Sequence, residues 1–339
     1  MSMIQNIGVL GAGSWGTALA ILFDKNGHRT TMWEFRADAV ARLIKNRENS
    51  EFLPGAKLPQ SLQITNSLEE SCEDKDIIVI AVPSHVVREV AEKIARLSIK
   101  KDTIFVSVSK GIENGTLMRM SEILKATIPA LTADRIVTLS GPSHAEEVSR
   151  NIPTAIVAAC ESLATAEFIQ DTFMNPVFRV YSSTDIMGVE LGGSLKNVIA
   201  IAAGICDGAG FGDNTKAALQ PRGLAEMARL GTKMGANPAT FAGLSGMGDL
   251  IVTCMSKHSR NRYVGEQIGK GIRLDEILKN MTMVAEGVKT TRSANQLSKE
   301  YKIEMPITEQ VYKILFENKN AKKALNELMM REPKQEKLG

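Results

Sequence analysis

Short apolar runs alternate with stretches of helical spacing through the first half of the chain. Some of the runs, such as 77–82, are uninterrupted by polar residues, as in strands of a parallel sheet that are buried on both faces. This half is therefore predicted to form a mostly parallel sheet covered by helices. The predicted strands are 7–10, 29–33, 77–82, 103–108, 136–139, 155–158 and 177–181, and the predicted helices are 17–26 and 84–97, the latter with Ser84 as N-cap.

The pattern changes after about Thr184. Strand-like runs almost disappear, and apolar residues recur at helical spacing to the end of the chain. The sequence thus predicts a Rossmann-like α/β domain over residues 1–184 and an all-helical domain over residues 185–332. The helices predicted in the second domain are 189–205, 216–234, 238–243, 262–269, 290–300, 307–316 and 320–330.

The composition excludes several classes of protein. A net charge of +3 over 339 residues, without a block of basic residues, argues against nucleic acid as a partner. The four cysteines are widely spaced, which argues against a zinc site and favours free thiols in a reducing compartment. No continuous apolar stretch is long enough for a membrane span, and residues 1–6 do not resemble a signal peptide. A cytoplasmic protein without a metal is expected.

A glycine-rich loop follows the first predicted strand and opens the first predicted helix. In this context Gly11 permits a tight turn, Gly13 lets a pyrophosphate approach the backbone, and Gly16 lets the helix pack closely on the strand. The unpaired N–H groups at the start of the helix would then bind the phosphates of a dinucleotide. The loop reads Gly11-Ala12-Gly13-Ser14-Trp15-Gly16.

Two charged residues after the second predicted strand bear on the choice of cofactor. Glu34 occupies the position where an acid binds the 2′-hydroxyl of the adenine ribose, which favours NAD. Arg36 could instead bind a 2′-phosphate, which favours NADP. The sequence leaves the choice between NAD and NADP open.

A polar pair interrupts the most apolar helix of the second half. Lys196 and Asn197 lie within a stretch of small and apolar residues. A buried lysine is costly unless it is paired or functional, and desolvation lowers its pKa toward values that suit acid/base catalysis. Lys196 is therefore a candidate catalytic residue.

Motifs spread over nearly the whole chain resemble those of the bacterial NAD(P)-dependent glycerol-3-phosphate dehydrogenases. Other dehydrogenases with a Rossmann domain and a helical domain share only the glycine loop and a lysine on a helix. The matching segments are GAGSWGTALA from Gly11, FLPG from Phe52, VPSH from Val82, SKGIE from Ser109, SGPSHAEEV from Ser140, ELGGSLKNVIAIAAGICDG from Glu190, PRGLAEMARLG from Pro221, GLSGMGDLIVTC from Gly243, SRNRYVG from Ser259, VAEGVKT from Val284 and MPIT from Met305.

The resemblance implies reversible hydride transfer between a nicotinamide cofactor and carbon 2 of dihydroxyacetone phosphate or sn-glycerol 3-phosphate, for glycerophospholipid synthesis. It implies that Lys196 is the acid/base, with Lys110 and Asp249 beside it, and that the protein is a homodimer. The substrate-binding residues that it implies are Lys110, Gly141, Ser143, Lys196, Asn197, Asp249, Thr253, Ser259, Arg260 and Asn261. The cofactor-binding residues that it implies are Gly11, Gly13, Ser14, Trp15, Gly16, Arg36, Lys110, Ala145, Arg260, Val284 and Glu286.

Two other functions remain open at this point. One is a different dehydrogenase of the same architecture, of the 3-hydroxyacid or 6-phosphogluconate type. The other is a module that senses the NAD(H) redox state without catalysis, although such a module would not need Lys110, Lys196 and Arg260 together. The chain departs from the family at Gln220-Pro221, where we expect the helix to bend or to restart at the proline.

Overall fold

The chain forms two compact units in the computed structural model, which describes residues 3–129, 131–333 and 335–336. The first unit comprises Met1–Ser109 and Met120–Ile186, and the second comprises Lys110–Arg119 and Met187–Gly339. The segment Lys110–Arg119 thus belongs to the second unit, whereas two continuous domains were predicted. Residues 1 and 2, at the start of the stretch considered for a signal peptide, lie outside the described residues.

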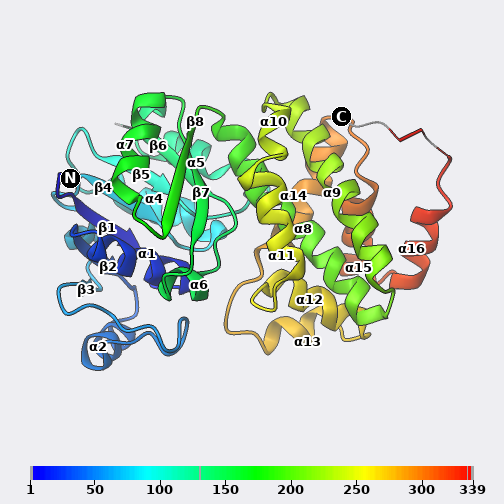
Figure 1. Ribbon diagram of the computed structural model, residues 1–339, viewed down its shortest axis with the longest axis horizontal. Helices are drawn as coiled ribbons and strands as arrows, with labels where there is room; N and C mark the ends of the chain where they lie inside the picture. The colour runs from blue at the N-terminus through cyan, green and yellow to red at the C-terminus, as the bar shows by residue number, and fades with distance from the viewer. Residues whose placement is uncertain (1–2, 130, 334, 337–339) are drawn as a thin grey trace. The chain divides into compact units, whose positions relative to one another are not determined.

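An eight-stranded sheet forms the centre of the first unit, in the order β3-β2-β1-β4-β5-β6-β7-β8 (Figure 1). All neighbouring strands are parallel except β6 and β7, which are antiparallel. The predicted α/β class is therefore confirmed. The strands are β1 (Asn6–Leu10), β2 (Arg29–Trp33), β3 (Gln63–Thr65), β4 (Ile77–Ile80), β5 (Ile104–Ser107), β6 (Ile136–Ser140), β7 (Thr154–Ala159) and β8 (Phe178–Ser183).

The direction in which successive strands are added to the sheet reverses at β1. From β1 the chain moves to β2 and β3 on one side, and then returns to β4 on the other side of β1. Because crossovers between parallel strands are right-handed, the connections in these two directions place their helices on opposite faces of the sheet. The helices of this unit are α1 (Ser14–Lys25), α2 (Ala37–Asn46), α3 (Leu68–Cys72), α4 (Val87–Ile94), α5 (Met120–Thr127), α6 (Ala145–Ser149) and α7 (Leu163–Phe173), with 3-10 turns at Ser84–Val86 and Ala133–Arg135.

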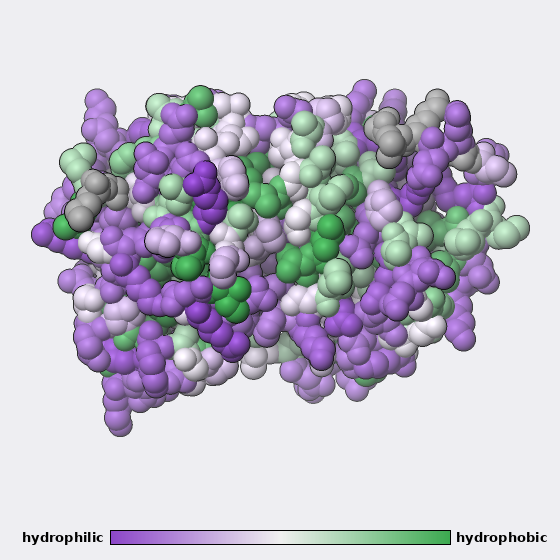
Figure 2. Space-filling view, in the orientation of Figure 1, coloured by the Kyte–Doolittle hydropathy of each residue, from purple (hydrophilic) through white to green (hydrophobic). Residues whose placement is uncertain are grey.

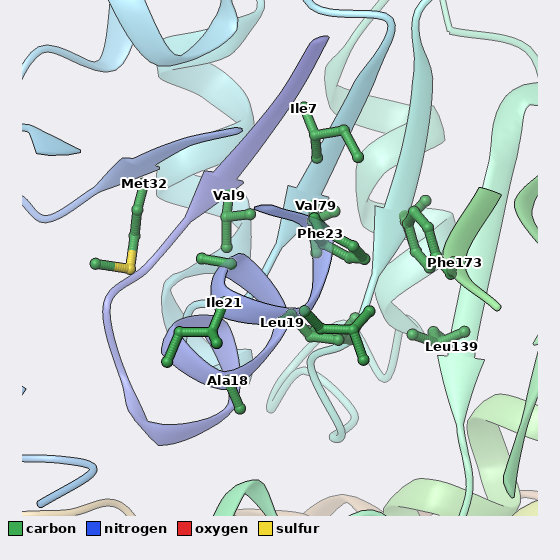
Figure 3. Packing of buried hydrophobic residues seen from close by; sticks show 14 of the residues in the cluster. Ile7, Val9, Ala18, Leu19, Ile21, Phe23, Met32, Val79, Leu139 and Phe173 are labelled. Atoms are coloured by element: carbon green, nitrogen blue, oxygen red, sulfur yellow. The ribbon is translucent and has the colours of Figure 1, made fainter. Parts of the chain in front are cut away.

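The hydrophobic core of this unit joins α1 to the middle of the sheet (Figure 3). Ile7 and Val9 of β1 are fully buried, as are Leu19 and Phe23 of α1. The Phe23 ring lies 4.3 Å from that of Phe173, centroid to centroid, which ties α1 to the end of α7. This packing fixes the start of α1, and with it the glycine loop, against β1.

Several local features of the first unit differ from the predictions, which also left out helices α2, α3, α5, α6 and α7. Strand β3 was missed because it has only three residues. Strand β7 runs antiparallel to β6, which continuous apolar runs cannot reveal because they do not encode direction. Ser84 is not an N-cap, because it lies in a 3-10 turn that precedes α4 and that has Pro83 at its own N-cap.

Helices make up the second unit, as predicted, around a separate hydrophobic cluster. Helix α8 is long and apolar enough to span a membrane, but its whole apolar window is buried inside the protein, so it is a core helix. Figure 2 shows hydrophilic residues over most of the visible face, with smaller hydrophobic areas among them. The helices are α8 (Ile186–Ala209), α9 (Asp213–Met234), α10 (Pro238–Phe241), a π-helical turn at Leu244–Gly248, α11 (Asp249–Met255), α12 (Arg260–Gly269), α13 (Leu274–Lys279), α14 (Glu286–Glu300), α15 (Pro306–Phe316) and α16 (Ala321–Met329).

Helices α8 and α12 approach each other so closely that only glycine fits at the contact. A Cβ atom on Gly204 would lie 1.9 Å from the Arg262 carbonyl oxygen, and one on Gly208 would lie 2.0 Å from that of Glu266. From the other side, a Cβ on Gly265 would lie 2.0 Å from the Ile201 carbonyl oxygen. The contact places the backbone of α12 directly on that of α8, which carries Lys196 and Asn197.

Helix α9 continues through Pro221 from Asp213 to Met234. The expected restart of the helix at Pro221 is therefore wrong. Pro221 is exposed, so water can reach the Ala217 carbonyl to which a proline cannot donate a hydrogen bond. The short helices α11 and α13 were not predicted.

Candidate active site

The glycine loop has the geometry of a phosphate-binding turn. Gly11 has a φ of 117°, and a Cβ atom there would lie 2.8 Å from the Ala81 carbonyl oxygen. A Cβ on Gly16 would lie 2.0 Å from the Gly11 carbonyl oxygen, so the helix starts against the turn itself. By contrast, nothing lies within 4 Å of a Cβ on Gly13, which leaves this backbone open to a ligand. The loop therefore fits a pyrophosphate.

Helix α1 begins at this open position. Gly13 is its N-cap and makes no side-chain cap, and its first turn contains no acidic residue that would repel an anion. Trp15 packs against the core, while the Ser14 hydroxyl donates to the Phe52 carbonyl at 2.6 Å. The structure thus uses the Ser14 side chain to tie the loop to the segment that contains Phe52.

Asn49 holds the same segment to the glycine loop, and sequence reasoning did not find it. Its side chain is buried and donates to the Ala12 carbonyl and to the Thr17 hydroxyl, both at 2.8 Å. Its own amide oxygen accepts from the backbone N–H of Phe52 at 3.2 Å. No local signal marks its role, because the two residues of the loop and of α1 to which it donates lie more than 30 positions away and its segment has no regular periodicity.

Glu34 and Arg36 form an ion pair with each other, with Arg36 Nε 2.9 Å from Glu34 Oε1. Glu34 is buried, directly after β2, and it also accepts from the backbone N–H of Arg36. The other two nitrogens of the Arg36 guanidinium donate to Glu51, at 3.2 and 3.3 Å. The pKa of Arg36 is raised by its hydrogen bonds to Glu34 and Glu51.

A second candidate segment of the first unit follows β6. Gly141 has a φ of 148°, and a Cβ atom there would lie 2.9 Å from the Ile156 Cα, so this position requires glycine. The Ser143 hydroxyl donates to the Gly141 carbonyl at 3.0 Å and braces the turn. Ala145, the first residue of α6, is buried. These residues lie with the glycine loop in the first unit.

In the second unit, two lysines converge on one carboxylate. Lys196 Nζ lies 2.7 Å from Asp249 Oδ1, and Lys110 Nζ lies 2.6 Å from Asp249 Oδ2. The Lys196 ammonium also donates to the Thr253 hydroxyl at 2.6 Å. Asp249 and Lys196 are almost completely buried, whereas 20% of the Lys110 side chain is exposed. The predicted residues Lys110, Lys196, Asp249 and Thr253 thus form one hydrogen-bonded cluster.

Burial and charge adjust the acidity of this cluster. Burial lowers the pKa of Lys196 to about 8, and the positive charge of Lys110 acts in the same direction, while Asp249 opposes both. Burial alone would raise the pKa of Asp249, but the two ammonium groups outweigh it and hold this pKa below its usual value. The cluster is therefore an ionised aspartate with a lysine that can release a proton near neutral pH.

The segment Lys110–Arg119 is built into the second unit by buried polar contacts. The Ser293 hydroxyl donates to the Ile112 carbonyl at 3.0 Å and to the Asn114 side chain at 2.6 Å. At the other end of the segment, the Arg119 guanidinium lies 2.6 Å from a Glu190 carboxylate oxygen of α8. These contacts fix the backbone that carries Lys110.

A second polar chain starts from the residue beside Lys196. The Asn261 side chain donates to the Asn197 amide oxygen at 2.9 Å and accepts from the Gly287 N–H at 2.8 Å. It therefore connects α8, α12 and the start of α14. Ser259 is the N-cap of α12 and accepts from the Arg262 N–H. Of the remaining candidates, Arg260 is exposed at the start of α12, and Val284 and Glu286 are half-buried at the start of α14.

The first unit thus carries a dinucleotide-binding turn, and the second carries a buried lysine whose pKa burial lowers toward neutrality. Among the described residues, no group of three or more histidine, cysteine, aspartate or glutamate side chains could hold a metal ion. Together, the fold and these two sites define a dinucleotide-dependent oxidoreductase.

Comparison with known proteins identifies the family. The N-terminal profile of the NAD-dependent glycerol-3-phosphate dehydrogenases matches residues 6–166, and the C-terminal profile matches residues 185–326. The chain belongs to this family.

Individual relatives agree with this result. The chain is 52% identical over 328 residues to glycerol-3-phosphate dehydrogenase [NAD(P)+] of Bacillus pumilus, covering 97% of this chain and 95% of the relative. It is 53% identical over 335 residues to the enzyme of the same name from Geobacter metallireducens, covering 99% and 100%. The crystal structure of glycerol-3-phosphate dehydrogenase from Coxiella burnetii matches with a TM-score of 0.92 at 36% identity, covering 97% and 99%. The resemblance predicted from the motifs is confirmed, and the two alternative functions are not supported.

Proposed function

We propose that this enzyme reduces dihydroxyacetone phosphate to sn-glycerol 3-phosphate, reversibly, with NADH or NADPH, and so supplies the backbone of glycerophospholipids. The observation that carries the proposal is the buried cluster of Lys110, Lys196 and Asp249, in a chain that belongs to the glycerol-3-phosphate dehydrogenases. When bound, the nicotinamide supplies the hydride to carbon 2 of the ketone.

Lys196 is the proton donor in this proposal. The carbonyl oxygen of the substrate gains negative charge as the ketone is reduced, and an adjacent ammonium group stabilises this charge and then donates its proton. A pKa of about 8 keeps Lys196 protonated at pH 7 and still makes it a stronger acid than an ordinary lysine. In the reverse direction, the neutral amine accepts the proton of the alcohol.

Asp249 positions the two ammonium groups. Each of its oxygens accepts from one lysine, so that both charges are held on the same side of the substrate. Thr253 accepts a further hydrogen bond from Lys196 and donates to the Asp249 carbonyl, which leaves the ammonium little rotational freedom. The partly exposed Lys110 adds positive charge for the substrate.

The substrate phosphate is assigned to the beginning of α12. Arg260 offers a planar set of donors at an exposed position, and the helix N-terminus favours an anion. One N–H of the Asn261 amide is used by Asn197, which leaves its second N–H for the phosphate. Further substrate contacts are assigned to Gly141, Ser143, Asn197 and Ser259, and further cofactor contacts to Lys110, Ala145, Arg260, Val284 and Glu286.

The substitution Lys196→Ala tests this assignment. Turnover with dihydroxyacetone phosphate should fall by about 10²- to 10⁴-fold, because the proton donor is lost. The dissociation constant of NADH, measured by its fluorescence in the absence of substrate, should change little. Lys270→Ala, which removes an exposed lysine of the second unit, is the control. Wild-type turnover in the Lys196→Ala variant would exclude Lys196 as the acid/base, and a wild type that does not reduce this ketone would exclude the proposed reaction.

We also propose a cytoplasmic homodimer. The family resemblance supports the dimer, and the four buried, unpaired cysteines support a reducing compartment. Light scattering after gel filtration should give twice the 36.8 kDa mass of the chain. A monomer mass would contradict the dimer, and recovery of the enzyme outside the cytoplasmic fraction would contradict the location.

A further inference from the structure

Glu51, which lies outside the glycine loop and β2, forms an ion pair with Arg36. Arg36 is the residue that would bind the 2′-phosphate of NADPH. Glu51 lies in the irregular segment after α2, 15 residues beyond Arg36. Its two carboxylate oxygens accept from the two terminal nitrogens of the Arg36 guanidinium, at 3.2 and 3.3 Å. This is the two-pronged geometry in which an arginine binds a carboxylate or a phosphate.

The ion pair with Glu51 occupies the two N–H groups of Arg36 that a 2′-phosphate would need for the same two-pronged contact. Arg36 has five N–H donors, of which Nε donates to Glu34 and one on each terminal nitrogen donates to Glu51. A 2′-phosphate could bind the guanidinium in the same way only by displacing Glu51. A 2′-hydroxyl needs only the Glu34 carboxylate, which is fixed directly after β2.

The charges around this position oppose a phosphate as well. Glu34, Glu51 and Asp38 supply three negative charges, and Arg36 and Arg42 supply two positive charges. The group is therefore negative by one charge, whereas a phosphate monoester brings a further charge of about −1.5 to −2. Such repulsion is screened by salt but remains appreciable over a few ångströms.

Other contacts hold Glu51 at this place. The carbonyl of its neighbour Phe52 accepts a hydrogen bond from the Ser14 hydroxyl, and the Phe52 N–H donates one to the Asn49 side-chain oxygen, so this backbone is tied to the glycine loop. The Phe52 ring also lies 5.7 Å from the Arg36 guanidinium carbon. Glu51 thus belongs to the segment that is hydrogen-bonded to the glycine loop.

We infer that Glu51 is a specificity-determining residue that engages Arg36 and makes the enzyme favour NADH over NADPH. Glu34 accepts a hydrogen bond from the 2′-hydroxyl of NADH. Glu51 pairs with Arg36 and so keeps it from binding the 2′-phosphate of NADPH. This inference rests on the proposed assignment of the glycine loop as the cofactor site.

The test compares Glu51→Gln with Asp38→Asn, which removes a neighbouring negative charge that pairs with Arg42 instead of Arg36. Dissociation constants of NADH and NADPH are measured by nicotinamide fluorescence without substrate, and kcat/KM is measured with each cofactor and dihydroxyacetone phosphate. Wild type should bind NADH more tightly than NADPH. Glu51→Gln should improve NADPH binding and kcat/KM by roughly five- to tenfold relative to NADH. Asp38→Asn should change the ratio less than twofold.

A double variant, Glu51→Gln with Arg36→Gln, shows whether the gain acts through the arginine. The relative gain for NADPH should disappear in it. The inference is overturned if wild type favours NADPH, if Glu51→Gln leaves the ratio unchanged, if Asp38→Asn shifts it equally, or if the double variant retains the gain. Failure of wild type to bind either cofactor would instead contradict the proposed cofactor site, so the two failures are distinguishable.

Discussion

Two carboxylates buried in the second unit, Asp249 and Glu226, have pKa values that move in opposite directions. Burial raises the pKa of Glu226 to about 7, although its oxygens accept from the N–H groups of Ile307 and Thr308 at the start of α15. Burial acts on Asp249 in the same sense, but two ammonium groups outweigh it. The two carboxylates are similarly buried but differ in their partners. Glu226 caps the start of α15, whereas Asp249 is an anion held between two lysines.

The pH dependence of catalysis should reflect the charge on Asp249. In wild type, kcat/KM for ketone reduction should fall as pH rises through about 8, because neutral Lys196 has no proton to donate. The negative charge of Asp249 favours the ammonium form, so Asp249→Asn should lower the pKa of Lys196 and move this fall to lower pH. The kcat at pH 7 should also drop, by roughly 10- to 100-fold. Rates measured from pH 6 to pH 10 check this prediction. It would be contradicted if the rate fell at the same pH in wild type and in Asp249→Asn.

At the scale of helices, we expect the contact between α8 and α12 to affect both the stability of the protein and the substrate binding proposed for α12. Gly204→Ala would place a methyl group 1.9 Å from the Arg262 carbonyl oxygen, and the two helices would have to separate. Overpacking of this kind costs about 1–3 kcal/mol in the free energy of unfolding. Because α12 begins at Arg260 and Asn261, we also expect KM for dihydroxyacetone phosphate to rise several-fold.

Denaturant unfolding and steady-state kinetics measure both effects of Gly204→Ala. Gln267→Ala, on α12, adds no atoms and should leave KM near the wild-type value. A Gly204→Ala variant with wild-type stability and wild-type KM would show that the helices can separate without cost.

Sequence patterns predicted several of the longer elements, because their cause is local, although α2 and α7 were missed. Strand β2 was predicted at its observed bounds, Arg29–Trp33, and α15 within one residue of its start. The three-residue β3 and the antiparallel direction of β7 depend on pairing with distant strands, so no local pattern predicts them.

The residues of the site likewise divide into those that a local pattern can predict and those that it cannot. The glycine loop could be recognised from spacing, and Lys196 from its apolar surroundings. The partners of Lys196 were named only through the family resemblance, because no local pattern links residues as distant as Lys110 and Asp249, 139 positions apart, and Asn49, in an irregular segment, was not found at all. The engagement of Arg36 by Glu51 likewise depends on a turn that only the folded chain defines.

At the scale of the whole chain, each unit has its own hydrophobic cluster. Phe173 is fully buried in the first cluster and Phe241 in the second. We expect two calorimetric transitions, with Phe173→Leu lowering the midpoint of one and Phe241→Leu that of the other by a few degrees. NADH should raise the transition that Phe173→Leu lowers, since a ligand stabilises the unit that binds it. A single transition that both substitutions shift equally would contradict this.

The placement of Lys110–Arg119 has a consequence for recombination between relatives. A chimaera joined only at residues 186 and 187 would inherit Lys110 from one parent and Asp249, its ion-pair partner, from the other. Ser293 and Glu190, which hold the segment, would also come from the second parent. A hybrid that takes the whole second unit from one parent therefore needs two exchanged segments. The shorter one, the ten residues 110–119, decides whether Lys110 and Lys196 come from the same parent.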